Sequence, residues 1–148
     1  MPTLSFVSFK EDMQLDHQYI NIAADNATYA GTGVDMTGYQ GVVFIASCAQ
    51  GTVATFSMKA QQDAASTYAS AADLLSTSVS CVTGTQSDGF MFVEILNPGE
   101  QYVRPVITVA NLSTPNGVAI CSIRYGKDRR PETNADGEFH FAPAEGTA

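Results

Sequence analysis

The sequence has few basic side chains, and this scarcity limits the partners that the protein can take. Lys and Arg together number 7 against 15 Asp and Glu among 148 residues, so the formal net charge is −8. Binding to nucleic acid relies on a basic face that displaces counterions from the phosphates. We therefore expect neither nucleic acid nor an anionic membrane surface as a partner. The basic residues are scattered, apart from one group at Lys127, Arg129 and Arg130.

Targeting signals and paired cysteines are also missing. No run of about 18 apolar residues occurs, so we expect no membrane-spanning helix. The first residues, "MPTLSFVSFKEDM", lack the basic and then apolar pattern of a secretory signal. Cys48, Cys81 and Cys121 show no C-x-x-C spacing, which argues against zinc or a redox dithiol. We expect each cysteine to be a small buried apolar side chain, in keeping with a reducing cytoplasm.

Catalytic signatures are equally scarce. The two histidines, His17 and His140, do not form the His-x-His spacing of a jelly-roll metal enzyme, and no nucleophile elbow, phosphate-binding loop or dinucleotide glycine pattern occurs. One glycosidase-like carboxylate pair, Glu94 and Glu100, remains open. A cross-strand pairing of Glu94 with Arg104 or Arg124 is the favoured interpretation. We therefore expect a protein that is not an enzyme and that has no cofactor and no metal.

What the sequence does contain is short runs rich in Val, Ile, Phe and Thr, separated by turn residues. Such residues fit a pleated, half-buried surface. We predict strands at 4–9, 18–23, 41–47, 52–59, 90–96, 102–110 and 117–125, with a further one at 138–142. Many short strands in a chain of one-domain length predict an all-β fold over residues 1–126, an antiparallel β-sandwich of jelly-roll-like type.

Turn residues and one Ala-rich stretch complete this prediction. Asp88-Gly89 and Asn116-Gly117 are typical of two-residue type I′ hairpins. Residues 59–78 are Ala-rich but have poor apolar spacing, so a short helix and a long ordered loop are equally expected there. The run "VVFIA" at 42–46 is apolar on both faces, which predicts a central strand or one that is covered twice.

The stretch "QYVRPVITV" at 101–109 combines a proline with two apolar faces. Pro105 cannot donate a hydrogen bond to a neighbouring strand, which predicts an edge strand or a bulge. An apolar edge strand is prone to aggregation unless something covers it. We therefore expect a partner subunit to cover it, with Tyr102 and Arg104 as interface residues.

The last part of the chain, 127–148, is polar and rich in turn residues apart from Phe139 and Phe141. Such a segment cannot bury enough apolar area to fold alone. The "FHF" alternation at 139–141 is what an added strand needs. The composition leaves open whether 127–148 is a frayed end or a C-terminal arm that docks on a neighbouring subunit.

Five blocks of the sequence, taken together, carry a family resemblance: "YQGVVFIA" (39–46), "MKAQQ" (58–62), "YVRPVITV" (102–109), "IRYGKDRRP" (123–131) and "FHFAPAEGTA" (139–148). They resemble a family of small proteins of tailed bacteriophages. The members that are understood act as cement, or decoration, proteins of the icosahedral head. The resemblance covers most of the chain from about Met36 onward.

The resemblance implies a jelly-roll or sandwich subunit that forms a homodimer or homotrimer. Such a subunit binds major capsid protein on the outer surface of the head, within a virion assembled in the host cytoplasm. It implies no catalysis and no cofactor. A tail or fibre subunit, and a carbohydrate-binding or hydrolysing virion module, remain alternatives. The expected partner-binding residues are Tyr102, Arg104, Pro105, Arg124, Lys127, Arg129, Arg130, Phe139, His140 and Phe141.

Overall fold

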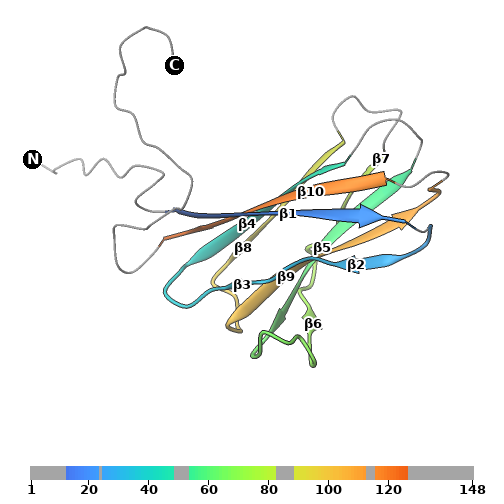
Figure 1. Cartoon of the computed structure of the whole chain (residues 1–148). Helices are drawn as coiled ribbons and strands as arrows, with labels where there is room; N and C mark the ends of the chain where they lie inside the picture. Colours follow the sequence, from blue (N-terminus) through green and yellow to red (C-terminus); the bar gives the residue numbers. More distant parts are fainter. Residues whose placement is uncertain (1–12, 24, 49–53, 83–88, 113–115, 127–148) are drawn as a thin grey trace, which may run out of the picture.

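The chain folds into two antiparallel β-sheets packed face to face, which confirms the all-β sandwich (Figure 1). The structure is a computed structural model and describes residues 13–23, 25–48, 54–82, 89–112 and 116–126. All regular elements in those ranges are strands. The described residues therefore contain no helix long and apolar enough to cross a membrane. The predicted strands at 4–9 and 138–142 lie outside the described residues.

The strands of the described residues follow one another in this order: β1 (Met13–Ile22), β2 (Thr28–Ala30), β3 (Val34–Asp35), β4 (Gly41–Cys48), β5 (Thr55–Asp63), β6 (Ala72–Asp73), β7 (Val79–Val82), β8 (Phe90–Leu96), β9 (Tyr102–Ala110) and β10 (Asn116–Tyr125).

The order of the strands within the sheets is that of a jelly roll. Sheet A runs β1-β10-β4-β8, and the centre of sheet B is the pair β9 and β5. In sheet B, β2 and β3 share the edge beside β9, while β6 and β7 share the edge beside β5. Each of these two edges counts as one strand of the jelly roll. The pairs are then β1 with β10, the β2–β3 edge with β9, β4 with β8, and β5 with the β6–β7 edge, so each pair is nested within the one before it. This nested pairing of antiparallel strands characterises the jelly roll.

Alternation along the strands puts every second side chain into the space between the sheets. Phe44 of β4, Phe56 of β5 and Ile120 of β10 are fully buried there. Burying a side chain of this size contributes about 1.5–3 kcal/mol each. Cys48 and Cys81 belong to the same core, with their Sγ atoms 3.8 Å apart, as the prediction of buried cysteines requires. Cys121 differs, because it is only half-buried.

β4, β8, β9 and β10 match their predicted positions, whereas β1 begins five residues before the predicted 18–23 and β5 extends four residues past the predicted 52–59. The short strands were not predicted. The bounds of β8 and β9 are those expected, and β4 is a central strand of its sheet, as its two apolar faces indicated. Residues 59–78 form the end of β5, a connection and β6, so the loop alternative holds and no helix forms. β2, β3, β6 and β7 have two to four residues each, too few for a periodic pattern.

Pro105 lies in an interior strand, so the prediction of an edge strand or bulge is wrong. β9 pairs along its whole length with β5. On its other side it pairs with β2 and then with β3, and Pro105 lies opposite the connection between them. The N–H of Gly31 donates to the carbonyl oxygen of Pro105 at 2.8 Å, so the proline nitrogen points to this side too. Because its missing N–H falls at a break in the neighbouring strand, an interior strand tolerates the proline.

Two glycines of sheet A lie directly under tyrosine rings. A Cβ atom on Gly117 would lie 1.7 Å from the Oη of Tyr19, and one on Gly41 would lie 2.3 Å from the Cζ of Tyr125. An aromatic ring that packs over a glycine of the adjacent strand restores the contacts that the missing side chain would make. Each tyrosine therefore ties its own strand to the next one.

The predicted hairpin turn at Asn116-Gly117 is wrong, and the packing of Tyr19 on Gly117 gives this glycine another role. Both residues lie inside β10, where Asn116 pairs with Ile22 of β1. Gly117 is required because Tyr19 occupies the place of a side chain, and it shows no positive φ of the kind a type I′ turn needs. The other predicted hairpin includes Asp88, which lies outside the described residues.

We expect the substitution Gly41→Ala to lower the free energy of unfolding by about 1–3 kcal/mol, the usual cost of overpacking. The added methyl group displaces the ring of Tyr125. Gly99→Ala is the matched control, because its Cβ would lie 3.5 Å from Gln62 Nε2, an ordinary contact. Urea denaturation of both variants tests this, and equal stability of the two variants would contradict it.

Candidate interaction surfaces

The side of sheet A that faces away from sheet B is largely apolar. The exposed fractions are 65% for Tyr19, 52% for Phe90, 58% for Phe92 and 61% for Leu96. The ring centroids of Phe90 and Phe92 are 6.4 Å apart. Single exposed apolar side chains are ordinary, but a contiguous group of them indicates an interaction surface.

The strand register defines this outer face of sheet A. It comprises Met13, Leu15, His17, Tyr19 and Asn21 of β1, Gly117, Ala119, Cys121, Ile123 and Tyr125 of β10, Gly41, Val43, Ile45 and Ser47 of β4, and Phe90, Phe92, Glu94 and Leu96 of β8. His17 and Glu94 are its only side chains of the Asp, Glu, Lys, Arg and His classes, and they lie on opposite edges of the sheet.

The outer face of sheet B is polar by contrast. The Nε and Nη2 atoms of Arg104 donate to Oε1 of Gln61 at 3.0 and 2.8 Å. Gln61 Nε2 donates to Asp73 Oδ1 at 2.8 Å, and Lys59 Nζ lies 2.6 Å from Asp73 Oδ2. Sheet B therefore shows the usual pattern of an antiparallel sheet with one solvated face.

Arg104 also stacks on a tyrosine whose backbone is strained. Its Cζ lies 4.4 Å from the centroid of the Tyr68 ring. Tyr68 has a φ of 52°, which a bulky residue rarely adopts and which costs about 1–3 kcal/mol. Its ring covers Gly33, where a Cβ would lie 1.6 Å from Tyr68 Oη, and burial raises the pKa of Tyr68 to about 12. The cation–π contact with Arg104 offsets part of this backbone strain.

Arg124 connects the two sheets at the polar end of the core. Its Nη1 donates to the carbonyl oxygen of Asp35 on β3 at 2.7 Å, and its Nη2 forms an ion pair with Asp16 Oδ2 at 2.9 Å. Its Cζ lies 4.8 Å from the centroid of the Tyr39 ring. A cavity of about 340 Å³ lies beside this cluster, and Gln18 of β1 also lines it.

Glu94 does not pair with an arginine, so that prediction is wrong. Its carboxylate accepts a hydrogen bond from the hydroxyl of Tyr125 on the outer face of sheet A. Burial and this hydrogen bond raise the pKa of Tyr125 to about 12. Arg124 is on the same strand as Tyr125, but one residue away, and so it points to the opposite side of the sheet. Arg104 belongs to the other sheet.

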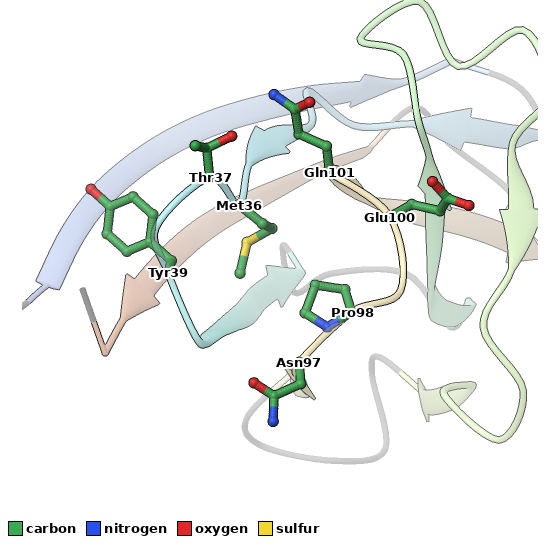
Figure 2. A pocket seen from close by; sticks show the side chains of 7 residues that line it. All are labelled: Met36, Thr37, Tyr39, Asn97, Pro98, Glu100 and Gln101. Carbon is green, nitrogen blue, oxygen red and sulfur yellow. The ribbon is translucent and has the colours of Figure 1, made fainter. Parts of the chain in front are cut away.

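The structure does not bring the two carboxylates of the glycosidase alternative into one cavity. A cavity of about 420 Å³ lies between the β3–β4 and β8–β9 connections, and Glu100 lines it while Glu94 does not. Figure 2 shows the carboxylate of Glu100 pointing away from Met36 and Pro98. The lining of this cavity therefore contains a single carboxylate and no basic side chain. It consists of Met36, Thr37, Tyr39, Asn97, Pro98, Glu100 and Gln101.

Within the part of the chain that the structure describes, no group of three or more His, Cys, Asp or Glu side chains is placed to hold a metal ion.

The predicted partner-binding residues are spread over both sheets. Tyr102 and Arg104 are half-buried on the outer side of β9, Pro105 is buried toward the core, and Arg124 lies in sheet A. Their partner-binding role stays a prediction. The other predicted residues, Lys127, Arg129, Arg130, Phe139, His140 and Phe141, lie outside the described residues.

The sequence prediction did not single out the outer face of sheet A, although the signal was present. Alternation in 90–96 puts Phe90, Phe92 and Leu96 on one side of β8. The run at 42–46 is apolar on both sides, and its outward residues include Val43 and Ile45. Neither run shows by itself that β8 and β4 are adjacent, and the patch exists only through that pairing.

Comparison with known proteins supports the fold and no more. No protein-family model matches the chain, and no curated sequence matches it either. Among solved structures, the PBSX exported protein XepA is similar at 13% identity and a TM-score of 0.53, over 88% of this chain. This chain spans only 43% of that protein. The disulfide-linked pili of Bacillus endospore appendages align at 10% identity and a TM-score of 0.44, over 85% of this chain and 99% of theirs.

We expect Asp63→Asn to destabilise the loop that carries Tyr68, and to do so in a pH-dependent way. Backbone N–H groups of Ala65 and Ser70 donate to the Asp63 carboxylate at 3.0 and 2.8 Å and lower its pKa below 3.8. A lowered pKa in the folded state stabilises the protein above the unfolded pKa, and this contribution is lost as the pH falls through the folded value.

The difference in unfolding free energy between the wild type and Asp63→Asn should therefore be largest near neutral pH. It should shrink as the pH falls below about 4. Urea denaturation at pH 7, 5 and 3 measures it. A difference that stays constant over this range would show that the charge of Asp63 does not stabilise the loop.

Proposed function

We propose that the protein is a structural virion protein. In this proposal it is a cement or decoration protein that binds the outside of the icosahedral head of a tailed bacteriophage and stabilises contacts between major capsid protein subunits. The observation that carries the proposal is the apolar outer face of sheet A, with Phe90, Phe92 and Leu96 each more than half exposed. A subunit with such a face is suited to assembly, because association removes that face from water.

The sequence blocks that resemble the phage cement family support the head as the place of assembly. The blocks at 39–46, 58–62 and 102–109 lie largely within β4, β5 and β9, and the block at 123–131 begins with the last three residues of β10. The fold of the PBSX exported protein XepA is compatible with this proposal without identifying a role.

The contact with the capsid is proposed to involve the arm, residues 127–148. It carries the basic group Lys127, Arg129 and Arg130 on a chain of net charge −8. Such a group gives a directional electrostatic contact that sets register and association rate more than affinity. In an oligomer each copy contributes one arm, and several modest contacts made at once bind far more tightly than one.

The experiment that tests the proposal is a copy-number measurement on purified virions of the source phage. We expect a copy number equal to that of the major capsid protein or to a simple fraction of it, because a cement protein follows the lattice of the head. Quantitative mass spectrometry measures the ratio. A few copies per particle would instead indicate the tail or the fibres, and absence from virions would overturn the structural role.

The same copy-number measurement, made on heads reconstituted in vitro, tests whether the arm contacts the capsid. Heads assembled without the protein are incubated with the full chain or with a chain that ends at residue 126. We expect the shortened chain to occupy clearly fewer sites, and the variant Arg129→Glu with Arg130→Glu to lose most occupancy at low salt, where charges are least screened. Undiminished occupancy of the shortened chain would exclude the arm as the capsid contact.

A further inference from the structure

We infer that the outer face of sheet A binds a second copy of this chain, face to face, about a two-fold axis that runs parallel to the strands. The inference rests on the proposed function only in treating the protein as an assembly subunit. It goes beyond that proposal because it names the occupant of the face and the arrangement of the pair.

The flat footprint of the face is somewhat smaller than a standard dimer interface, and its protruding side chains bring it closer to that size. Four strands about 4.8 Å apart span about 19 Å, and strands of 7 to 10 residues at about 3.4 Å per residue span about 24–34 Å. The flat footprint is therefore roughly 450–650 Å², and the protruding aromatic side chains add accessible area to it. A standard-size interface takes about 800 Å² from each partner.

The charges of the molecule favour this face over others for self-association. Each copy carries a formal charge of −8, so two copies repel each other on average. The outer face of sheet A contributes one carboxylate, Glu94, and one histidine, His17, and contains no Asp, Lys or Arg. Copies that meet through it bring few like charges together.

The positions of these two side chains select the symmetry. Glu94 lies on β8, in one row with Val43, Ile123 and Leu15. His17 lies on β1 at the opposite edge of the sheet, one row further along. A two-fold axis between β10 and β4 places β8 of one copy over β1 of the other and keeps the rows level. Glu94 then lies about 7 Å along the strand from His17 of the second copy, since one row is two residues.

Two facing sheets pack about 10 Å apart, so with the offset of about 7 Å the Cα atoms of Glu94 and His17 lie about 12 Å apart. Extended glutamate and histidine side chains span this distance together once the Glu94 carboxylate turns from Tyr125 toward the second copy. The contact then occurs twice in the dimer, once at each edge. The same axis puts Phe92 over His17 of the second copy and Phe90 over Tyr19 of the second copy. Aromatic side chains thus lie beside both Glu94–His17 contacts and enclose the apolar centre, which Ile45 and Cys121 form.

The test uses the full chain in isolation and measures its association by sedimentation equilibrium. We expect the wild type to dimerise, and Phe92→Lys to raise the dimer dissociation constant at least tenfold. Because Phe92 is 58% exposed, this substitution should leave the fold intact, which circular dichroism checks. Thr55→Lys is the matched control, since Thr55 is a half-buried outward residue of sheet B, and we expect it to dimerise as the wild type does.

A charge exchange then tests the axis. His17→Glu alone puts two carboxylates together at each edge and should weaken the dimer. Combining it with Glu94→His recreates both pairs with the partners exchanged, and should return the dissociation constant to within about threefold of the wild type. Failure of the double variant to recover, when Phe92→Lys does dissociate the dimer, would overturn the proposed axis.

A wild type that remains a monomer at about 100 µM, or that forms a trimer, would overturn the inference. So would a dimer that Thr55→Lys dissociates and Phe92→Lys does not. A monomer would also be the result if residues 1–12 or 127–148 of the same chain, or the major capsid protein, cover the face. The measurement needs no virions, so its failure is distinguishable from that of the cement role, which the copy number decides.

Discussion

A sheet in a two-layer sandwich can have only one of its faces covered by the other sheet, and this constraint shapes the whole molecule. Sheet B has one apolar and one polar face, as is usual for such a sheet. Phe56 and Met58 point toward the core, and Arg104, Gln61 and Lys59 point toward water. Sheet A lacks this division, because β4 and β8 carry apolar side chains on both of their sides. Each exposed apolar Å² that association removes from water contributes about 25 cal/mol. The difference between the two outer faces is therefore the main reason to regard this protein as a subunit.

Pairs of glycine and tyrosine stabilise the outer face of sheet A. Tyr19 covers Gly117 and Tyr125 covers Gly41, so two rings lie across strands that would otherwise have gaps. Tyr125 also donates its hydroxyl hydrogen to Glu94, two strands away. The one acidic side chain of the face is thus held in position. Arg124, on the inner side of the same strand, joins β10 to β3. Neighbouring residues of β10 thus have different roles: Arg124 points inward and stabilises the subunit, whereas Tyr125 belongs to the outer face.

Much of the fold was predictable because strands have a period of two that short runs already reveal. The faces of 90–96 and 102–110 followed directly from alternation, and the number of runs indicated an antiparallel sandwich. Three features were not predictable. The break beside Pro105, the approach of Tyr19 to Gly117 and the hydroxyl partner of Glu94 all depend on which strands are neighbours. A single sequence contains no such pairing information.

The same limit explains why the sequence prediction placed its candidate surface on β9 and did not single out the outer face of sheet A. The surplus of apolar side chains was recognised, but it was assigned to β9, where β5 and the β2–β3 edge flank the strand. Residues 59–78 show a related effect. Their alanines favour a helix, yet Asp63 takes up the backbone N–H groups of Ala65 and Ser70 and fixes a loop instead.

Cys121 provides the most direct measurement of the central claim, that the outer face of sheet A is buried in the working assembly. Its thiol is half-buried at the middle of that face, whereas Cys48 and Cys81 are buried in the core. Burial raises the pKa of Cys121, so alkylation is best followed by mass spectrometry at a mildly alkaline pH. The account predicts that Cys121 reacts in the dilute isolated protein and is at least tenfold slower in the assembled protein. Equal rates in the two states would contradict it.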